Sequence, residues 1–321
     1  MPEPTPHDRQ GGKSRSRHAL HLSPGRFTRP GTAPGDLSHP PELRQIPASL
    51  YLLDFDASDL TEKKGCTLEE AEEFFASPRT TWLHVQGTPT AELLRSVGET
   101  YHLHPLALED VLHVGQRAKL ESYDSEIFAV LGIPQLIGGR ILTAQLSVFL
   151  GKTWVVSFVS GEHDPFEAIR QRAAQADSRI RRGGVDYLFY SLLDTAIDLS
   201  FPTMEAIGER IEALELTVFD DPSREALDEI HQLKRELLLL RRILWPQRDM
   251  LNSLVRDEHA QIQEATRPYL RDCYDHSIHA LDLVEIYREM ASSLLEIYLS
   301  SLSNRLNDVM KVLTIIATVF I

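Results

Sequence analysis

Alternating apolar and polar positions in the first half of the chain predict a sheet with helices beside it. The runs Ser49–Phe55 and Thr81–Val85 have the composition of strands. Between them, Thr67–Ala76 predicts a helix in which Thr67 is the N-cap and the glutamate three residues later completes a capping box. Ala91–Tyr101 predicts a second helix. This order of elements indicates an α/β domain.

Three further strand-like runs follow, and short turn-forming segments separate them. Gly138-Gly139 and Gly151-Lys152 supply the turns, so the three runs predict an antiparallel meander. The runs are Glu126–Pro134, Ile141–Leu150 and Trp154–Val159. The sheet of this domain is therefore expected to be mixed, and the fold class of the chain is α+β.

From Pro165 the apolar period is helical and stays so to the end of the sequence. Pro165–Ile180 predicts a helix with Asp164 as N-cap and proline at its first position. The segment Arg181–Gly184 is expected to break it. Val185 to about Phe219 then predicts one long helix.

A second long helix should return antiparallel to the first. The turn at 220–223 separates the two, and Ser223 caps the second helix, which runs to about Glu258. Pro246 should kink this helix or mark its end. The two helices together predict a long helical hairpin.

The last helix begins at Arg267 or Pro268, and the sequence has no proline or glycine from Tyr269 to its end. At 1.5 Å per residue, such a helix is roughly 80 Å long, which predicts a coiled coil, a membrane stalk or both. An approximate 3.5-residue repeat supports a coiled-coil-like seam. The seam consists of Tyr274, Leu281, Val284, Ala291, Leu295, Tyr298, Leu302, Leu306 and Val309.

The final ten residues, Val312–Ile321, read VLTIIATVFI and carry no charge. About 20 apolar residues are needed to span a bilayer, so this run is half of that length. We expect it to be the first half of a transmembrane helix. The alternative is a C-terminal helix that docks into the core of a soluble fold.

These patterns divide the chain into four parts. Residues 1–48 are rich in Pro, Gly, Ser, His and Arg and predict a disordered tail. Residues 49–164 form the α/β domain, residues 165–311 the long-helix stalk bundle, and residues 312–321 the start of a transmembrane helix.

Charge and composition narrow the possible functions. The 321 residues include 33 Lys and Arg against 47 Asp and Glu, a formal net charge of −14, which disfavours nucleic acid and favours cations. Cys66 and Cys273 are far apart in sequence, which indicates a reducing, cytosolic compartment. We find no Walker loop, GxSxG, HExxH or GxGxxG motif, so we do not expect an enzyme.

An acidic stripe runs along the last helix. Its members, Asp275, Asp282, Glu289 and Glu296, are seven residues apart, and Asn304 and Asn307 lie just before the apolar end. A solvated helix face would explain such a stripe. If several copies pack around an axis, however, each position becomes a ring of oxygens that attracts hydrated cations.

Five separated blocks of sequence resemble the CorA family of magnesium channels, in order and at matching separations over residues 50–321. The blocks are HPLALEDVLHVGQRAKLE (104–121), DYLFYSLLD (186–194), HQLKRELLLLRRILWPQRDML (231–251), RPYLRDCYDHSIHALD (267–282) and YLSSLSNRLNDVMKVLTIIATVFI (298–321). The resemblance implies a homopentameric funnel with five long helices around a pore. In that family a Gly-Met-Asn loop and a second membrane helix follow. We therefore expect this chain to be the cytosolic portion plus half of the first membrane helix.

The resemblance also implies the site residues. Regulatory magnesium sites between subunits would use Glu109, Asp110, Asp194 and Asp272, and magnesium binding would close the pentamer. The pore would be lined by Asn307, Met310, Thr314, Ala317 and Ile321, with Glu296 as an acidic ring above it. The expected function is transport of magnesium, and of cobalt or nickel, across the plasma membrane. Its partners would be further copies of the chain, membrane lipid and divalent cations, with this region in the cytoplasm.

Two alternatives remain open. His102 and His104 with the nearby acidic pair, or His276 and His279 on the last helix, could bind zinc, which would favour a zinc transporter of the same family. A soluble cation-binding scaffold is the other alternative, and it requires the apolar C-terminus to be buried in the fold.

Overall fold

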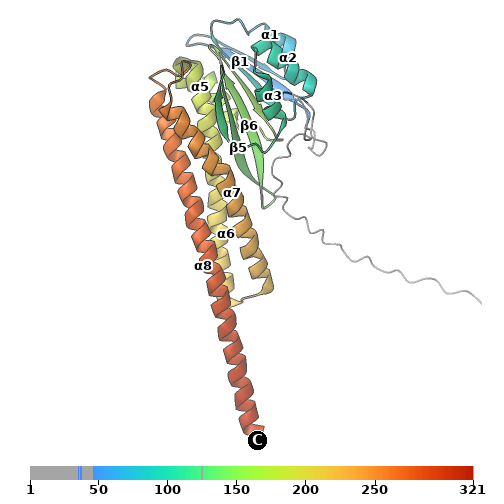
Figure 1. Ribbon diagram of the computed structural model, residues 1–321, viewed down its shortest axis with the longest axis vertical. Helices are drawn as coiled ribbons and strands as arrows, with labels where there is room; N and C mark the ends of the chain where they lie inside the picture. Colours follow the sequence, from blue (N-terminus) through green and yellow to red (C-terminus); the bar gives the residue numbers. More distant parts are fainter. Residues whose placement is uncertain (1–34, 36, 38–45, 124–125, 321) are drawn as a thin grey trace, which may run out of the picture.

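A computed structural model describes residues 35, 37, 46–123 and 126–320 (Figure 1). Most of the expected tail, 1–48, and the last expected pore residue, Ile321, lie outside the described residues. The described part is an α+β domain from which three long helices extend, and α8 (Arg267–Phe320) projects well beyond the other two (Figure 1). The mixed sheet and the long helices agree with the predicted fold class.

One seven-stranded sheet organises the α+β domain, in the order β2-β1-β3-β7-β6-β5-β4. Only β3 and β7 pair in parallel, and the other neighbours are antiparallel, so the predicted meander of β5, β6 and β7 is confirmed. The strands are β1 (Ser49–Phe55), β2 (Leu60–Lys64), β3 (Thr80–Gln86), β4 (Lys119–Ser122), β5 (Ile127–Ile137), β6 (Arg140–Leu150) and β7 (Trp154–Val159).

The two faces of the sheet bury two separate cores, because successive strand residues point to opposite faces. On β1, Leu52 belongs to one core and Leu53 to the other. The first face is covered by α1 (Leu68–Glu72), α2 (Ala91–Tyr101) and α3 (Pro105–Leu112). The second is covered by α4 (Glu167–Ala174), α5 (Arg179–Asp198) and parts of α7 (Arg224–Arg256) and α8.

Local signals correctly located several element ends. Thr67 caps α1 with the predicted capping box, and α2 has the predicted bounds. Ser223 accepts a hydrogen bond from the backbone N–H of Ala226 and so caps α7. Three elements were not predicted: β2, β4 and α3. Both strands are short, polar and at the sheet edges, so they depend on pairing with a neighbour.

The helix predicted over Pro165–Ile180 is confirmed only in its middle part, as α4 (Glu167–Ala174), and both of its predicted ends are wrong. Helix α4 begins only at Glu167, since Phe166 has a φ of −107° and a ψ of 13°, outside the helical region, although Asp164 accepts a 2.8 Å hydrogen bond from the Phe166 backbone N–H as an N-cap would. It ends at Ala174, and α5 begins at Arg179.

The segment Arg181–Gly184 lies inside α5 and interrupts it at Gly184, whose φ of 81° is outside the helical region. The predicted single helix Val185–Phe219 is wrong as well, since α5 ends at Asp198 and α6 (Ser200–Asp220) follows. Pro202 has no N–H to donate to the helix turn before it, which accounts for a break at this point. Pro246, in contrast, does not end α7, which continues to Arg256.

Helices α6, α7 and α8 form the stalk bundle, with a third apolar core between them. The predicted seam of α8 packs in this core at Leu281, Val284, Ala291 and Tyr298. Beyond Tyr298 the helix extends past the α6–α7 turn (Figure 1), where Arg305 forms a 2.6 Å ion pair with Asp221.

Residues 302–320 of α8 are exposed in the single chain. The alternative of a docked C-terminal core helix is therefore wrong for these residues. Across 46–123 and 126–320, none of the helices has the length and hydropathy that crossing a bilayer requires.

Candidate functional site

Helix α3 carries the first expected acidic pair, Glu109 and Asp110. Its N-terminus is set by Pro105 at the first turn and by His104, whose Nδ1 accepts a hydrogen bond from the Leu106 N–H. The apolar side of α3 is buried against the sheet, which leaves both carboxylates on its partly exposed side. The sheet therefore fixes where this pair lies.

Asp110 has a cation from its own chain beside it. Lys119 Nζ, at the start of β4, lies 2.6 Å from the Asp110 carboxylate, which is 15% exposed. Burial raises the pKa of Asp110, and the hydrogen bond and charge of Lys119 oppose that effect. Gln145 of β6 donates a 2.9 Å hydrogen bond to the Asp110 carbonyl, so the backbone is held as well. Glu109, next to it, accepts a 2.7 Å hydrogen bond from the Gly35 N–H.

Asp194 lies in a second cluster, on the other side of the sheet. One ligand atom each from Asp194, Asp198 and His276 lies within 4.8 Å of the others, and this is the one such group of three or more among the described residues. His276 Nδ1 is 3.3 Å from Asp198 and 3.7 Å from Asp194, and its Nε2 is 3.9 Å from Asp272. The structure thus joins two expected residues, Asp194 and Asp272, through a histidine.

The Asp194 carboxylate is chemically suited to a cation. Its Oδ1 is buried and has no hydrogen-bond partner within the described part of the chain, while Tyr190 donates to Oδ2 at 3.1 Å. Burial raises the pKa of Asp194 and the charge of Asp198 raises it further, against the opposing effects of Tyr190 and His276. A bound divalent ion would remove the repulsion between the two carboxylates, and oxygen with imidazole nitrogen is a ligand set that such ions accept.

The two clusters do not meet within one chain. The apolar residues of α3 belong to the core on one face of the sheet, and those at the start of α8 belong to the core on the other face (Figure 1). Asp272 is 63% exposed. An ion held between Asp110 and Asp272 is therefore an arrangement between two copies, and it stays a prediction.

Other expected histidine ligands have structural contacts instead. His102 ends α2 in the left-handed conformation with φ of 57° and packs on Phe75. His104 caps α3 and stacks on Tyr123 at 4.2 Å. Neither forms a metal-ligand group with the acidic pair among the described residues, so the structure gives no support to the alternative of a zinc cluster there.

The expected pore residues lie on the part of α8 that is exposed in the single chain. Glu296, Asn307, Met310, Thr314 and Ala317 all have exposed side chains. Their steps of three or four residues from Asn307 onward place them on one side of the projecting helix. No residue of the same chain covers that side in the described structure.

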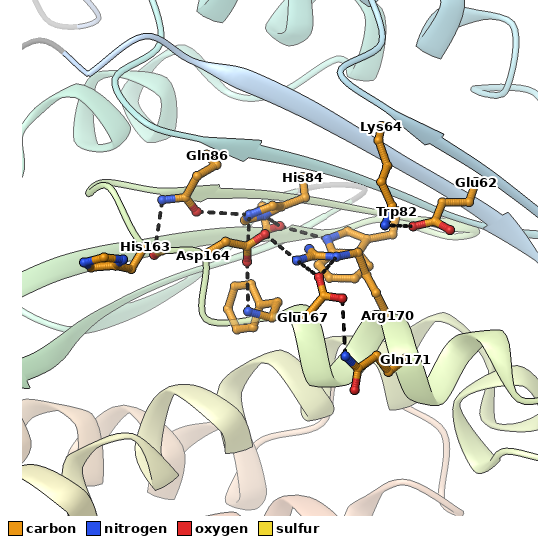
Figure 2. A network of polar contacts seen from close by, with 12 residues as sticks. Glu62, Lys64, Trp82, His84, Gln86, His163, Asp164, Glu167, Arg170 and Gln171 are labelled. Atoms are coloured by element: carbon orange, nitrogen blue, oxygen red, sulfur yellow. Dashed lines mark hydrogen bonds and ion pairs between the residues drawn. The ribbon is translucent and has the colours of Figure 1, made fainter.

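A buried polar network was missed by the sequence analysis (Figure 2). His84 Nδ1 lies 2.8 Å from Ser157 Oγ, and His84 Nε2 lies 3.6 Å from the Asp164 carboxylate, which Arg170 contacts at 2.5 Å. The strand period could have marked His84 as an inward-facing polar residue, but its partners come from distant segments.

This Ser–His–Asp order is that of an acyl-transfer triad, but access excludes the chemistry. Ser157 is 0% and His84 is 1% exposed, and Ser157 Oγ also accepts the Trp82 indole N–H at 2.8 Å. Burial lowers the pKa of His84 to about 4, so the ring is neutral near pH 7. The network thus fastens the segment before α4 to the sheet.

Comparisons with known proteins agree with this architecture. The family described as CorA-like Mg2+ transporter protein matches residues 78–321. The cobalt/magnesium transport protein CorA of Thermotoga maritima is 38% identical over 292 residues, covering 90% of this chain and 83% of the relative. The putative metal ion transporter YfjQ of Bacillus subtilis is 33% identical over 242 residues, 75% of this chain and 74% of the relative.

The solved structure of a complete transporter has a similar fold. The complete CorA magnesium transporter of Methanocaldococcus jannaschii superposes with a TM-score of 0.72 at 18% identity, over 86% of this chain and 84% of that one. The chain therefore belongs to the CorA-like Mg2+ transporter family, which confirms the resemblance drawn from the five sequence blocks. The family is described as one of transporters, in line with the expectation that the chain is not an enzyme.

Proposed function

We propose that this chain is the cytosolic, ion-sensing portion of a pentameric channel that passes magnesium, and also cobalt, across the plasma membrane. The observation that carries the proposal is α8: one helix of 54 residues joins the Asp194–Asp198–His276 cluster near its start to an exposed apolar end. Family membership and the cobalt/magnesium transport function of the Thermotoga relative support the choice of ions.

In this proposal the ion acts at the interface between copies. Asp110 of one copy and Asp272 of the next would share a hydrated magnesium ion, with Glu109 and Asp194 as further carboxylates close by. Magnesium binds hard oxygen ligands and keeps several of its waters, so two carboxylates are enough. Without the ion the carboxylates repel each other and the interface loosens. Binding shifts the population toward the closed assembly, which is negative feedback.

The projecting end of α8 would surround the pore. Five copies of Glu296 and Asn307 would form rings of oxygens that attract hydrated cations. Met310 and Ile321 would form apolar constrictions that close by dewetting, with Thr314 and the wider Ala317 between them. This assignment requires the exposed apolar residues of α8 to be covered by other copies and by lipid.

Protease protection of the assembled protein tests the proposal. Millimolar magnesium should slow cleavage of the wild type, and the double variant Asp110→Asn, Asp272→Asn should lose that protection. The matched control is Asp59→Asn with Asp177→Asn, which removes two exposed carboxylates elsewhere in the chain. A wild type that magnesium does not protect, or a D110N/D272N variant that it still protects, refutes the sensor assignment.

A zinc transporter of the same family is the second candidate, and His276 is the observation that favours it. Zinc prefers nitrogen ligands, and this imidazole faces Asp194 and Asp198. Under this candidate, His276→Ala should abolish zinc binding measured by calorimetry and leave magnesium protection unchanged. Equal zinc affinity of the wild type and the His276→Ala variant argues against a zinc transporter.

A further inference from the structure

Among the residues that the structure describes, Lys119 is the one that forms an ion pair with Asp110 of the α3 acidic pair. Its Nζ lies 2.6 Å from Asp110 and 2.9 Å from Glu121, so one ammonium bridges two carboxylates. The Lys119 side chain is about one-third exposed, and solvent therefore screens the pair only in part. A divalent cation at Asp110 would therefore compete with this ammonium for the carboxylate.

The structure holds Lys119 and its second carboxylate in place. Strand β4 pairs with β5, where Lys119 is opposite Val130, and Nζ lies 6.0 Å from the centre of the Phe128 ring. The Tyr123 hydroxyl donates a 2.7 Å hydrogen bond to Glu121. Glu121, 2.9 Å from the ammonium, is therefore a second partner for Lys119 besides Asp110.

We propose that Lys119 is a built-in competitor for the divalent cation at Asp110, and that it sets the ion concentration at which this carboxylate is occupied. The inference rests on the proposed function, because it assumes that Asp110 is an ion ligand. On binding, the ammonium moves from Asp110 to Glu121 while the cation takes its place. No covalent bond is made or broken in this exchange, and the net charge of the site becomes more positive by two.

Two opposite effects on the ion affinity follow. Removing the ammonium eliminates both the competition and the repulsion between like charges, so Lys119→Met should bind magnesium more tightly. Removing the second carboxylate leaves the ammonium with Asp110 alone, so Glu121→Gln should bind magnesium more weakly. A residue that only supported the local fold would weaken binding in both variants.

The expected size follows from the strength of partly exposed ion pairs. Lys119→Met should lower the magnesium concentration at half-maximal protease protection by about two- to fivefold. Glu121→Gln should raise it by about two- to fivefold. Lys152→Met is the matched control, because it removes an exposed lysine from the turn between β6 and β7 and should leave the midpoint unchanged.

The experiment titrates magnesium against the full chain at pH 8 and records both the protection midpoint and the melting temperature in a chelator. Opposite shifts of the midpoint in the two variants, with magnesium-free melting temperatures close to wild type, support the inference. A responsive wild type with Lys119→Met at the same midpoint overturns the inference and leaves the proposed function standing. A wild type that does not respond to magnesium overturns both.

Discussion

Glu126 links the sheet to the start of α3 and carries a charge that the fold disfavours. The residue directly precedes β5 and is 1% exposed. Its Oε1 accepts a 3.0 Å hydrogen bond from the His104 N–H, whereas Oε2 is buried with no hydrogen-bond partner in the described part of the chain. Burial raises the pKa of Glu126 to about 7, and the hydrogen bond from His104 opposes this only in part.

The direction of the pH effect follows from where the proton is held. The unfolded side chain loses its proton near pH 4.5, but the folded one keeps it until about pH 7. Between these values the folded state binds more protons, so the free energy of unfolding falls as the pH rises through this window. At 1.36 kcal/mol per pKa unit, the full loss is at most about 3 kcal/mol, and it is complete above pH 7.

Glu126→Gln keeps the shape and the acceptor oxygen but cannot ionise. We expect the advantage of the variant over the wild type in free energy of unfolding to be below about 1 kcal/mol at pH 5 and to grow by about 2–3 kcal/mol at pH 8. Urea denaturation followed by tryptophan fluorescence measures this, because Trp82 and Trp154 are buried in the sheet.

The exposed Glu99→Gln on α2 serves as the control and should follow the wild type at both pH values. Other groups titrate in the same range, so the informative quantity is the difference between variant and wild type. If that difference is the same at pH 5 and pH 8, the buried charge of Glu126 does not limit stability and the reasoning fails.

Three further changes test the packing by urea denaturation. Arg210→Met leaves the buried Glu236 of the stalk bundle without its 2.5 Å guanidinium partner and should lower the free energy of unfolding by about 2–4 kcal/mol. An unchanged free energy of unfolding would contradict this. Gly87→Ala places a Cβ 2.7 Å from the Pro47 carbonyl oxygen at a φ of +103°, so a loss of about 1–3 kcal/mol is expected, and unchanged stability would contradict the geometry. Leu237→Ala empties part of the bundle core and should cost about 2–5 kcal/mol, measured by helical circular dichroism, and a loss below 1 kcal/mol would mean that the core collapses around the cavity.

Elements with a local signal could be predicted from the sequence. The capping box at Thr67, the cap at Ser223 and the start of α8 at Arg267 depend on residues within one helical turn. The meander of β5 to β7 followed from alternating apolar residues with glycine turns. In contrast, β2 and β4 are short and polar, and they exist as strands because β1 and β5 pair with them.

Helix boundaries failed where a tertiary contact competed with the local pattern. Asp164 and a proline after it have the form of a helix start, yet the carboxylate is drawn to Arg170 and His84 in the buried network (Figure 2). The break between α5 and α6 was missed because the apolar pattern continues across it.

The acidic pair, Asp194 and Asp272 could be named from the family resemblance, but their surroundings could not. Lys119 lies nine residues from Asp110 in sequence and reaches it only because β4 pairs at the edge of the sheet beside α3. Asp198 and His276 are 78 residues apart and meet because α5 and α8 pack side by side.

By itself, the sequence determined the fold class, the family and the long final helix, because caps, turns and apolar periods act over a few residues. Only the tertiary structure decided which charges face each other. It placed α3 and the start of α8 on opposite faces of one sheet, gave Asp110 a lysine partner and gave Asp194 a histidine partner. The order of strands and the packing of helices set these distances, and both depend on contacts between residues far apart in the chain.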